Sequence, residues 1–382
     1  MKHGKDVMKK IGHNTHSKLL KVMIILAIIL VLELIAYFIY KRYYDNTCYD
    51  ILSNIYNGYV VEDDGYILVG NNDYIGTEDK KEYHNRALIQ GEIKKVDKDL
   101  NILWTASYYL EGDVDLIDIV KTKDGYIVIG NEREEKEHDD DYTGIILKVD
   151  KNGKVINTVK YDLLDNTKLH KIVRDGNNNI IIGESIYELD RIGNHLGGGI
   201  ILKVNDNLEI NEQNNYGGNK SGEFNNIFIL DDSYLVYGMD AGYPIIVKFN
   251  KNFNREESDT NLISEKIISY KTIDKDIEFH PLYYKNNKLY DGVNYMDLDN
   301  YKLEVLDKNK VLDNKLVISI QNDIIYAVSS NKLLQYNLDL ELLKEENANI
   351  DYISKVIPSN KNVIVGFKCN KCDCTSIIQY VN

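Results

Sequence analysis

The sequence predicts an all-β protein assembled from one repeated unit, and three observations support this fold class. A phrase made of a turn, a short apolar run and a glycine recurs along the chain. A second phrase, whose apolar run ends in Lys-x-Asp or Lys-x-Asn, follows each clear copy of the first. The units show no helical periodicity. A supersecondary unit that recurs in this way is stacked many times in the folded chain.

The first phrase reads as a strand between turn formers, because each run is short and rich in β-branched residues. Its copies close on glycines spaced by 60, 53 and 55 residues, and a fifth candidate, Gly292, follows after 54 more. The four clear copies are DGYILVG at Asp64–Gly70, DGYIVIG at Asp124–Gly130, NNNIIIG at Asn177–Gly183 and DSYLVYG at Asp232–Gly238.

The second phrase predicts another strand, followed by a tight turn. Asp and Asn tolerate left-handed backbone and cap their own turns, which is typical of hairpins. The lysine of this phrase is expected on a solvated strand face; a ring of amines lining a surface is the alternative. These lysines are Lys95, Lys148, Lys203 and Lys248.

Two further apolar stretches complete each unit, one after the turn and one before the next glycine phrase. Residues 322–343 and 360–382 keep the same order of apolar run, hydrophilic loop and apolar run. Four strands per unit joined by short turns indicate seven units, with six or eight as alternatives.

The pattern resembles the bacterial β-propeller repeats written DGGYIVVG…ALLVKLDxNGNxxW. Residues 57–250 carry the resemblance, and Trp104 stands at the expected place after the turn. The resemblance implies a propeller of four-stranded blades that presents loops for binding. It implies no single activity, because propellers carry unrelated functions.

Residues 22–40 form an apolar run of nineteen residues with one charge, Glu33, which is long enough to cross a bilayer as a helix. Six lysines precede it, so the positive-inside rule places residues 1–21 in the cytoplasm. We expect an uncleaved signal-anchor in the cell membrane, a linker at 41–48 and an extracellular propeller at 49–382. A cleaved signal peptide is disfavoured because the run ends in bulky aromatic residues.

Charge divides at the same point. Residues 1–42 carry eight Lys/Arg against two acids, and the rest of the chain carries 38 against 58. An acidic field repels phosphate backbones, which argues against a nucleic-acid partner. It attracts divalent cations or basic partners, and solubility alone also accounts for it.

The last unit lacks an outer strand, and the segment Tyr49–Tyr56 is expected to supply it and close the ring. Disulfides persist outside the cytoplasm, so Cys48 is expected to pair with one of three cysteines in the last unit. Zinc binding by the C-x2-C-x-C cluster is the alternative. The cysteines of the last unit are Cys369, Cys372 and Cys374.

Motifs for known catalytic or cofactor chemistry, such as HExxH, GxSxG or a P-loop, do not occur in the sequence. No catalytic residue and no cofactor is predicted. The acidic stretch 131–144 is interpreted as a solvated loop. Its candidate Ca²⁺ ligands are Asp139, Asp140 and Asp141, since oxygen ligands on a loop suit this ion.

These features predict a membrane-anchored binding or scaffolding module for an unknown protein or glycan, and the chain is not expected to be an enzyme. An envelope-assembly or secretion component is one alternative. A propeller hydrolase or lyase is another, and it requires carboxylates converging on the channel. Specific function is expected where the repeats differ, in the loops 132–143 and 185–198 and in the degenerate late blades.

Overall fold

The structure is a computed structural model that describes residues 51–381, with gaps at 53–54, 74–88, 111, 136–139, 163–165, 190–194, 217–221, 241–242, 252–267, 270–278, 301, 330, 349, 360 and 371–372. The chain divides into two compact units. One comprises Leu52–Cys369 with Cys374–Asn382 and is described below; the other comprises Met1–Ile51 with Asn370–Asp373. No helix in the described ranges is long and apolar enough to cross a membrane, and the expected span 22–40 lies outside them.

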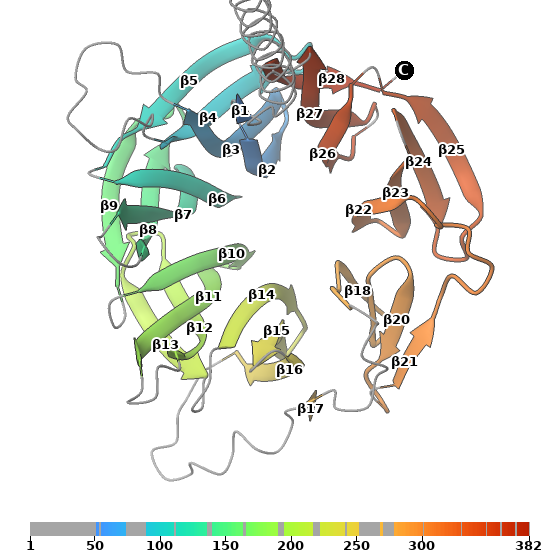
Figure 1. Ribbon diagram of the computed structural model, residues 1–382. Coiled ribbons are helices and arrows are strands. Elements are labelled where there is room, and N and C mark those ends of the chain that lie inside the picture. Colours follow the sequence, from blue (N-terminus) through green and yellow to red (C-terminus); the bar gives the residue numbers. More distant parts are fainter. Residues whose placement is uncertain are drawn as a thin grey trace, which may run out of the picture. The chain divides into compact units, whose positions relative to one another are not determined.

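The larger unit is a seven-bladed β-propeller, which confirms the predicted fold class and blade number. Seven antiparallel four-stranded sheets follow one another around a ring (Figure 1), and in blades 1 to 6 the strand that comes first in the chain is innermost. Blade 1 contains β2 (Ile55–Glu62), β3 (Gly65–Asp73), β4 (Ile89–Asp97) and β5 (Ile102–Tyr108). Blade 2 contains β6 (Asp113–Lys121), β7 (Gly125–Glu135), β8 (Asp140–Asp150) and β9 (Val155–Tyr161).

The other blades repeat this order. Blade 3 contains β10 (Thr167–Asp175), β11 (Asn178–Leu189), β12 (His195–Asn205) and β13 (Ile210–Tyr216). Blade 4 contains β14 (Gly222–Ile229), β15 (Ser233–Asp240), β16 (Tyr243–Asn250) and β17 (Ile268–Ser269). Blade 5 contains β18 (Tyr283–Lys285), β19 (Lys288–Tyr290), β20 (Asn294–Asp297) and β21 (Lys302–Val305). Blade 6 contains β22 (Leu316–Gln321), β23 (Ile324–Ser329), β24 (Lys332–Asn337) and β25 (Leu342–Asn347).

Blade 7 closes the ring as the sequence predicted. It contains β26 (Tyr352–Ile357), β27 (Val363–Asn370) and β28 (Asp373–Tyr380), and its sheet order is β1-β28-β27-β26. The strand β1 (Ile51–Leu52) lies within the segment that was expected to supply the missing outer strand. An apolar cluster that includes Tyr56 and Leu68 from blade 1 and Val363 from blade 7 joins the two ends of the ring.

The core of the propeller lies between blades rather than inside any one sheet. Each pair of neighbouring blades shares its own cluster of buried apolar side chains, so the clusters also number seven. In each clear repeat the second and third strands supply runs of β-branched residues that face both neighbours. This arrangement explains why both strands read as nearly continuous apolar runs.

A β-bulge in the innermost strand explains the glycine that made the repeat recognisable. In blade 3 the register of β10 on β11 shifts between Leu169 and Lys171, next to the pair formed by Leu169 and Gly183. A Cβ on Gly183 would lie 2.0 Å from the carbonyl oxygen of Lys168, so no larger residue fits. Equivalent shifts occur in blades 1, 2, 4, 6 and 7.

The turn after the second phrase is capped by its Asp or Asn, as predicted. In blade 2 the Oδ1 of Asp150 accepts the N–H groups of Asn152 at 2.8 Å and of Lys154 at 2.9 Å. Gly153 in this turn has a φ of 85°, and the ring of Trp104 from blade 1 covers it. The motif Asp-x-x-Gly and the tryptophan therefore form a contact between blades.

Other blades place a leucine where blade 2 has Gly153. Leu100, Leu208 and Leu340 have φ values of 66°, 69° and 62°. A left-handed backbone costs such a residue about 1–2 kcal/mol. Burial offsets this cost: Leu208 is 3% exposed and belongs to the cluster between blades 2 and 3.

Two local predictions were wrong. Gly292 was expected to close the strand phrase of the fifth unit, but it lies after β19 in a turn, with a φ of 99°. The acidic stretch 131–144 was expected to be a loop, but β7 continues to Glu135 and β8 begins at Asp140, so only 136–139 separate the two strands. The register pairs Glu135 with Asp140 and Glu134 with Asp141.

Candidate functional site in the central channel

The innermost strands surround a cavity of about 420 Å³ on the axis of the propeller. Its wall is about half apolar and half polar. Apart from Tyr59 and Gln321, the polar side chains of the wall enter at one repeated position, the residue that follows the bulge in the innermost strand. The residues at this position are Gly58, Asp118, Lys171, Asn226, Ser319 and Lys355.

Asp118 is the one carboxylate in the described wall of the cavity. Its Oδ1 accepts the N–H of Ile119 at 3.0 Å, and its Oδ2 accepts the N–H of Ile172 in the next blade at 3.3 Å. The Nζ of Lys171 lies 3.8 Å from the same Oδ2. These donors engage the carboxylate, which thereby joins blades 2 and 3.

Asn226 makes the same connection with an amide. Its Oδ1 accepts the N–H of Ile227 at 2.9 Å, and its Nδ2 donates to the carbonyl oxygen of Pro281 at 2.8 Å. A carboxylate could not donate this second bond. The residue type at this position therefore depends on whether the next blade offers an N–H or a carbonyl.

Lys355 is different, because the described residues give its ammonium no ion-pair partner. Its Nζ lies 6.0 Å from the centre of the Tyr59 ring. Burial lowers the pKa of this amine to about 8, the charge of Asp118 raises it, and that of Lys171 lowers it further. By surface area the side chain is only partly buried. The channel thus holds an amine that is poorly solvated and has no matched anion.

Tyr59 and Gln321 form a polar contact across the end of the same cavity. The Nε2 of Gln321 in blade 6 donates to the hydroxyl of Tyr59 in blade 1 at 2.9 Å, so the bond passes the innermost strand of blade 7. Both residues line the cavity. Their hydrogen bond fixes two of the groups that a ligand beside Lys355 would meet.

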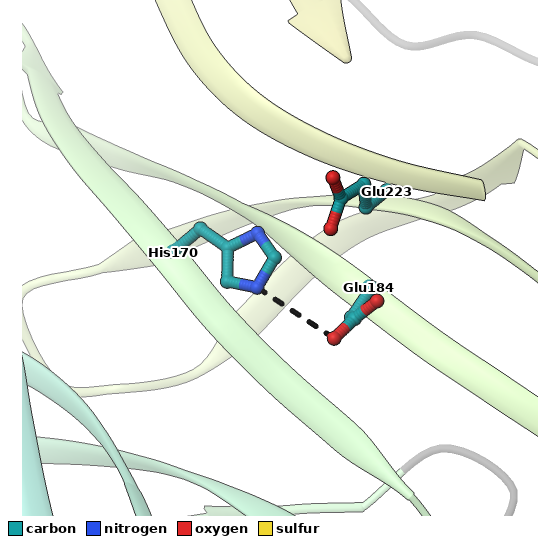
Figure 2. Close-up of side chains that lie close together, drawn as sticks. All are labelled: His170, Glu184 and Glu223. Carbon is teal, nitrogen blue, oxygen red and sulfur yellow. Dashed lines mark ion pairs between the residues drawn. The ribbon is translucent and has the colours of Figure 1, made fainter. Parts of the chain in front are cut away.

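A second group of polar side chains lies between blades 3 and 4. His170 is the bulge residue of β10, and its side chain converges with those of Glu184 from β11 and Glu223 from β14 (Figure 2). The Nε2 of His170 lies 3.8 Å from Oε1 of Glu184. All three residues are partly buried, and their donor atoms lie within 4.8 Å of one another.

A related group lies between blades 1 and 2. The side-chain amides of Asn57 and Asn71 both donate to Oδ1 of Asp115, each at 2.9 Å. Burial raises the pKa of the Asp115 carboxyl to about 6, although the two amide donors lower it. A carboxyl with such a raised pKa is typical of functional sites, but here its neighbours are neutral amides.

The site residues proposed from the sequence lie elsewhere. Asp140 and Asp141 begin β8, and Asp139 lies outside the described residues, so the Ca²⁺ site stays a prediction. Cys48 and Cys372 also lie outside them. Cys369 is the penultimate residue of β27, and Cys374 lies in β28. The disulfide pairing stays a prediction.

The lysine of the second phrase is on the third strand of its blade, away from the channel wall. Lys95 pairs with Asp64 at 2.9 Å and Lys203 with Glu212 at 3.4 Å. The described wall of the cavity contains none of the four lysines in this column. Their place argues against a ring of amines around the cavity, but the predicted solvated face is correct only for Lys248, because the side chains of Lys95 and Lys203 are 13% and 15% exposed.

Sequence reasoning missed the channel residues, although a signal for them exists. A polar residue interrupts the apolar stretch before each turn at one repeated place. The stretches are LIDIV, LHKIV, FNNIF, VISIQ and ISKVI, which contain Asp118, Lys171, Asn226, Ser319 and Lys355 respectively. Aligning the repeats on this stretch would have placed these side chains together.

Neither a family model nor a curated protein matches this chain. Similar solved structures include acylaminoacyl peptidase from Pyrococcus horikoshii, with 10% identity, a TM-score of 0.47, and coverage of 84% of this chain and 50% of that one. The chain thus spans half the length of that peptidase. A candidate 6-phosphogluconolactonase from Bacteroides fragilis shows 11% identity, a TM-score of 0.43, and coverage of 84% and 99%. At these TM-scores the likenesses carry no argument about function.

Proposed function

We propose that this protein is a binding protein whose central channel takes a small organic anion. The observation that supports this proposal is Lys355, an amine in the wall of a 420 Å³ cavity without an ion-pair partner among the described residues. Lys171 stands in the same wall, while Asp118 is engaged by backbone N–H groups. The wall therefore has an excess of positive charge in a chain of net charge −14.

The chemistry of the wall narrows the ligand class. A site of this volume suits a small molecule, and the apolar half of the wall accommodates an apolar body beside the charged group of the ligand. Lys355 supplies a charge for a carboxylate or phosphate group. Tyr59, Gln321 and Ser319 supply further hydrogen-bonding groups.

Benzoate and benzylamine test this proposal, because they share a ring and differ in the sign of their charge. We expect benzoate to raise the melting temperature of the wild-type chain and benzylamine to leave it unchanged. At ten times the dissociation constant the stabilisation is about 1.4 kcal/mol, roughly 3 °C for a domain of this size. Acetate and inorganic phosphate then show whether the ring or the anion dominates.

Lys355→Met should abolish the effect of benzoate. Lys332→Met is the control, since Lys332 lies on the third strand of blade 6 and pairs with Glu345 at the surface. Equal stabilisation by benzoate and benzylamine, or an undiminished benzoate effect in Lys355→Met, would refute an anion site in the channel.

The hydrolase or lyase alternative requires at least two catalytic groups facing the channel. Paired carboxylates are the common arrangement for glycoside hydrolysis. The described wall offers one, Asp118, and both of its oxygens accept backbone hydrogen bonds. The geometry therefore favours binding over catalysis.

We also propose that residues 22–40 anchor the propeller at the outer face of the cell membrane. The supporting features are the apolar length of that run and the lysines before it. Protease treatment of intact cells should remove the propeller, and its protection would contradict the orientation.

A protein or glycan partner could bind at the loops, or the chain could belong to an envelope-assembly complex. Purification from solubilised membranes tests both, and a stoichiometric partner would support them.

A further inference from the structure

We propose that His170, Glu184 and Glu223 bind a divalent transition-metal ion such as Zn²⁺. The proposal is independent of anion binding in the channel. It begins with the tautomer of His170. The Nδ1 of this ring lies 2.9 Å from the carbonyl oxygen of Phe224. A carbonyl can only accept a hydrogen bond, so Nδ1 carries the proton and the neutral ring presents the lone pair of Nε2.

That lone pair faces a carboxylate. The Nε2 of His170 and Oε1 of Glu184 are 3.8 Å apart. Two acceptors in this position repel unless a proton or a cation lies between them. A metal-bound histidine commonly donates its other ring N–H to a backbone carbonyl, which is the bond that His170 makes.

The repeat provides an internal comparison. Where two neighbouring blades both carry the bulge and the first also carries the glycine, their interface has three equivalent positions: the bulge residue, the residue after the glycine, and the residue two before the bulge of the next blade. Between blades 1 and 2 they hold Asn57, Asn71 and Asp115, and both amides donate to the carboxylate.

Between blades 3 and 4 the same positions hold His170, Glu184 and Glu223. The bond from His170 to the Phe224 carbonyl repeats the bond from Asn57 to the Leu116 carbonyl. The donors toward the carboxylate are not repeated, because an imidazole lone pair and a second carboxylate replace them. A cation at the centre would attract the carboxylates, as the two amide N–H donors attract the carboxylate of Asp115 between blades 1 and 2.

The surrounding contacts fit a metal site. The Nδ2 of Asn225 donates to Oε1 of Glu223 at 2.9 Å, which orients that carboxylate and leaves its other oxygen available. Ligand atoms around tetrahedral Zn²⁺ lie about 3.4 Å apart. The donor atoms here lie within 4.8 Å of one another, so small side-chain rotations complete the geometry. An imidazole with two carboxylates suits Zn²⁺ or a similar ion rather than Ca²⁺, which takes oxygen ligands.

Lys168 competes with the metal. Its Nζ lies 3.2 Å from Oε1 of Glu184 and 4.2 Å from the centre of the Tyr142 ring. Metal binding requires this ammonium to move away or to keep only one oxygen of the carboxylate. Lys168→Met should therefore tighten metal binding several-fold.

The test is equilibrium dialysis of the purified, chelator-treated full-length chain against Zn²⁺, with the bound metal measured by atomic spectrometry. Because other parts of the chain hold cysteines and acids, the informative quantity is the difference between variants. We expect His170→Gln and Glu184→Gln each to lose one equivalent of bound Zn²⁺, or to bind it at least tenfold more weakly. Asp115→Asn changes the position equivalent to Glu223 in another interface, and it should leave zinc binding unchanged.

A second variant tests the equivalence directly. Asn57→His combined with Asn71→Glu places the same donor set around Asp115, and it should add one equivalent of bound Zn²⁺. Circular dichroism and the melting temperature establish that each variant folds. Wild-type zinc binding in the folded His170→Gln and Glu184→Gln variants, or no zinc bound by the wild-type chain at micromolar concentrations, would overturn the proposal.

Discussion

Replacing Lys355 by methionine should stabilise the propeller while it abolishes anion binding. The pKa of this amine is about 8, compared with 10.5 for an unperturbed lysine. That difference corresponds to about 3 kcal/mol for holding the charge in the folded channel. Channel water reduces this cost, so we expect the variant to gain about 1–2 kcal/mol of unfolding free energy at pH 7. Methionine keeps the length and the apolar contacts of the side chain.

The sign of the pH dependence follows from the lowered pKa. Below pH 8 the amine is protonated in both the folded and the unfolded chain, and the full penalty is present. Between pH 8 and 10.5 the unfolded chain binds more protons, so the stability of the wild type rises with pH. The advantage of the variant should therefore be largest at pH 7 and should shrink steadily by pH 9.5.

Urea unfolding of both proteins at pH 7, 8 and 9.5 measures this difference. Lys171→Met is the matched control, because its amine is 43% exposed and lies 3.8 Å from Asp118. This control should be neutral or slightly destabilising. A Lys355→Met variant that is less stable than wild type at pH 7, or whose advantage is the same at all three pH values, would refute the idea of a poorly solvated amine. Asp118, Lys171 and Tyr59 are the titratable groups that face Lys355 and enter this balance.

Two further substitutions test close contacts made by glycines of the repeat. Gly183→Ala would place a Cβ 2.0 Å from a backbone carbonyl oxygen, and we expect it to lower the unfolding free energy by about 3–5 kcal/mol in urea titrations. Gly222→Ala is the control, because its new Cβ would lie 3.3 Å from the nearest atom, and it should lower the unfolding free energy by less than about 1 kcal/mol. Equal effects of the two substitutions would contradict the role of the bulge. Gly153→Ala should disturb the ring of Trp104, which would stand 2.6 Å from the new Cβ. Because Trp104 is the only tryptophan, a change in the emission spectrum of the folded protein reports this directly, and an unchanged spectrum would show that the ring does not cover the turn.

The repeat was predictable from the sequence because its signals come from the backbone. Gly183 is needed by a close carbonyl, and Asp150 is needed to cap a turn. Such demands recur in most blades, so they leave a periodic pattern. Leu208 shows the limit of this reasoning, because a buried leucine can occupy a left-handed position that the pattern assigns to glycine.

The candidate sites were not predicted, for a related reason. Lys355 and His170 stand at positions where the residue type varies from blade to blade, so an alignment of the repeats shows no pattern there. Their meaning depends on what neighbouring blades place beside them. Glu184 and Glu223 are 39 residues apart and come together only because blade 4 packs on blade 3. The loops that were expected to carry function are the places where the repeats differ in length. The candidate sites instead occupy aligned positions, where the repeats have the same length and differ only in residue type.

The completion of blade 7 by β1 has a consequence for how the chain folds during synthesis. An open array of repeats can fold unit by unit as it leaves the ribosome, since each repeat needs only its predecessor. Here the outer strand of the last blade, β1, is synthesised first, and its partner β28 is synthesised about 320 residues later. Pairing across such a separation is slow. Until it occurs, blades 1 and 7 expose apolar faces, and we expect a nascent six-blade chain to depend on protection from association with its neighbours.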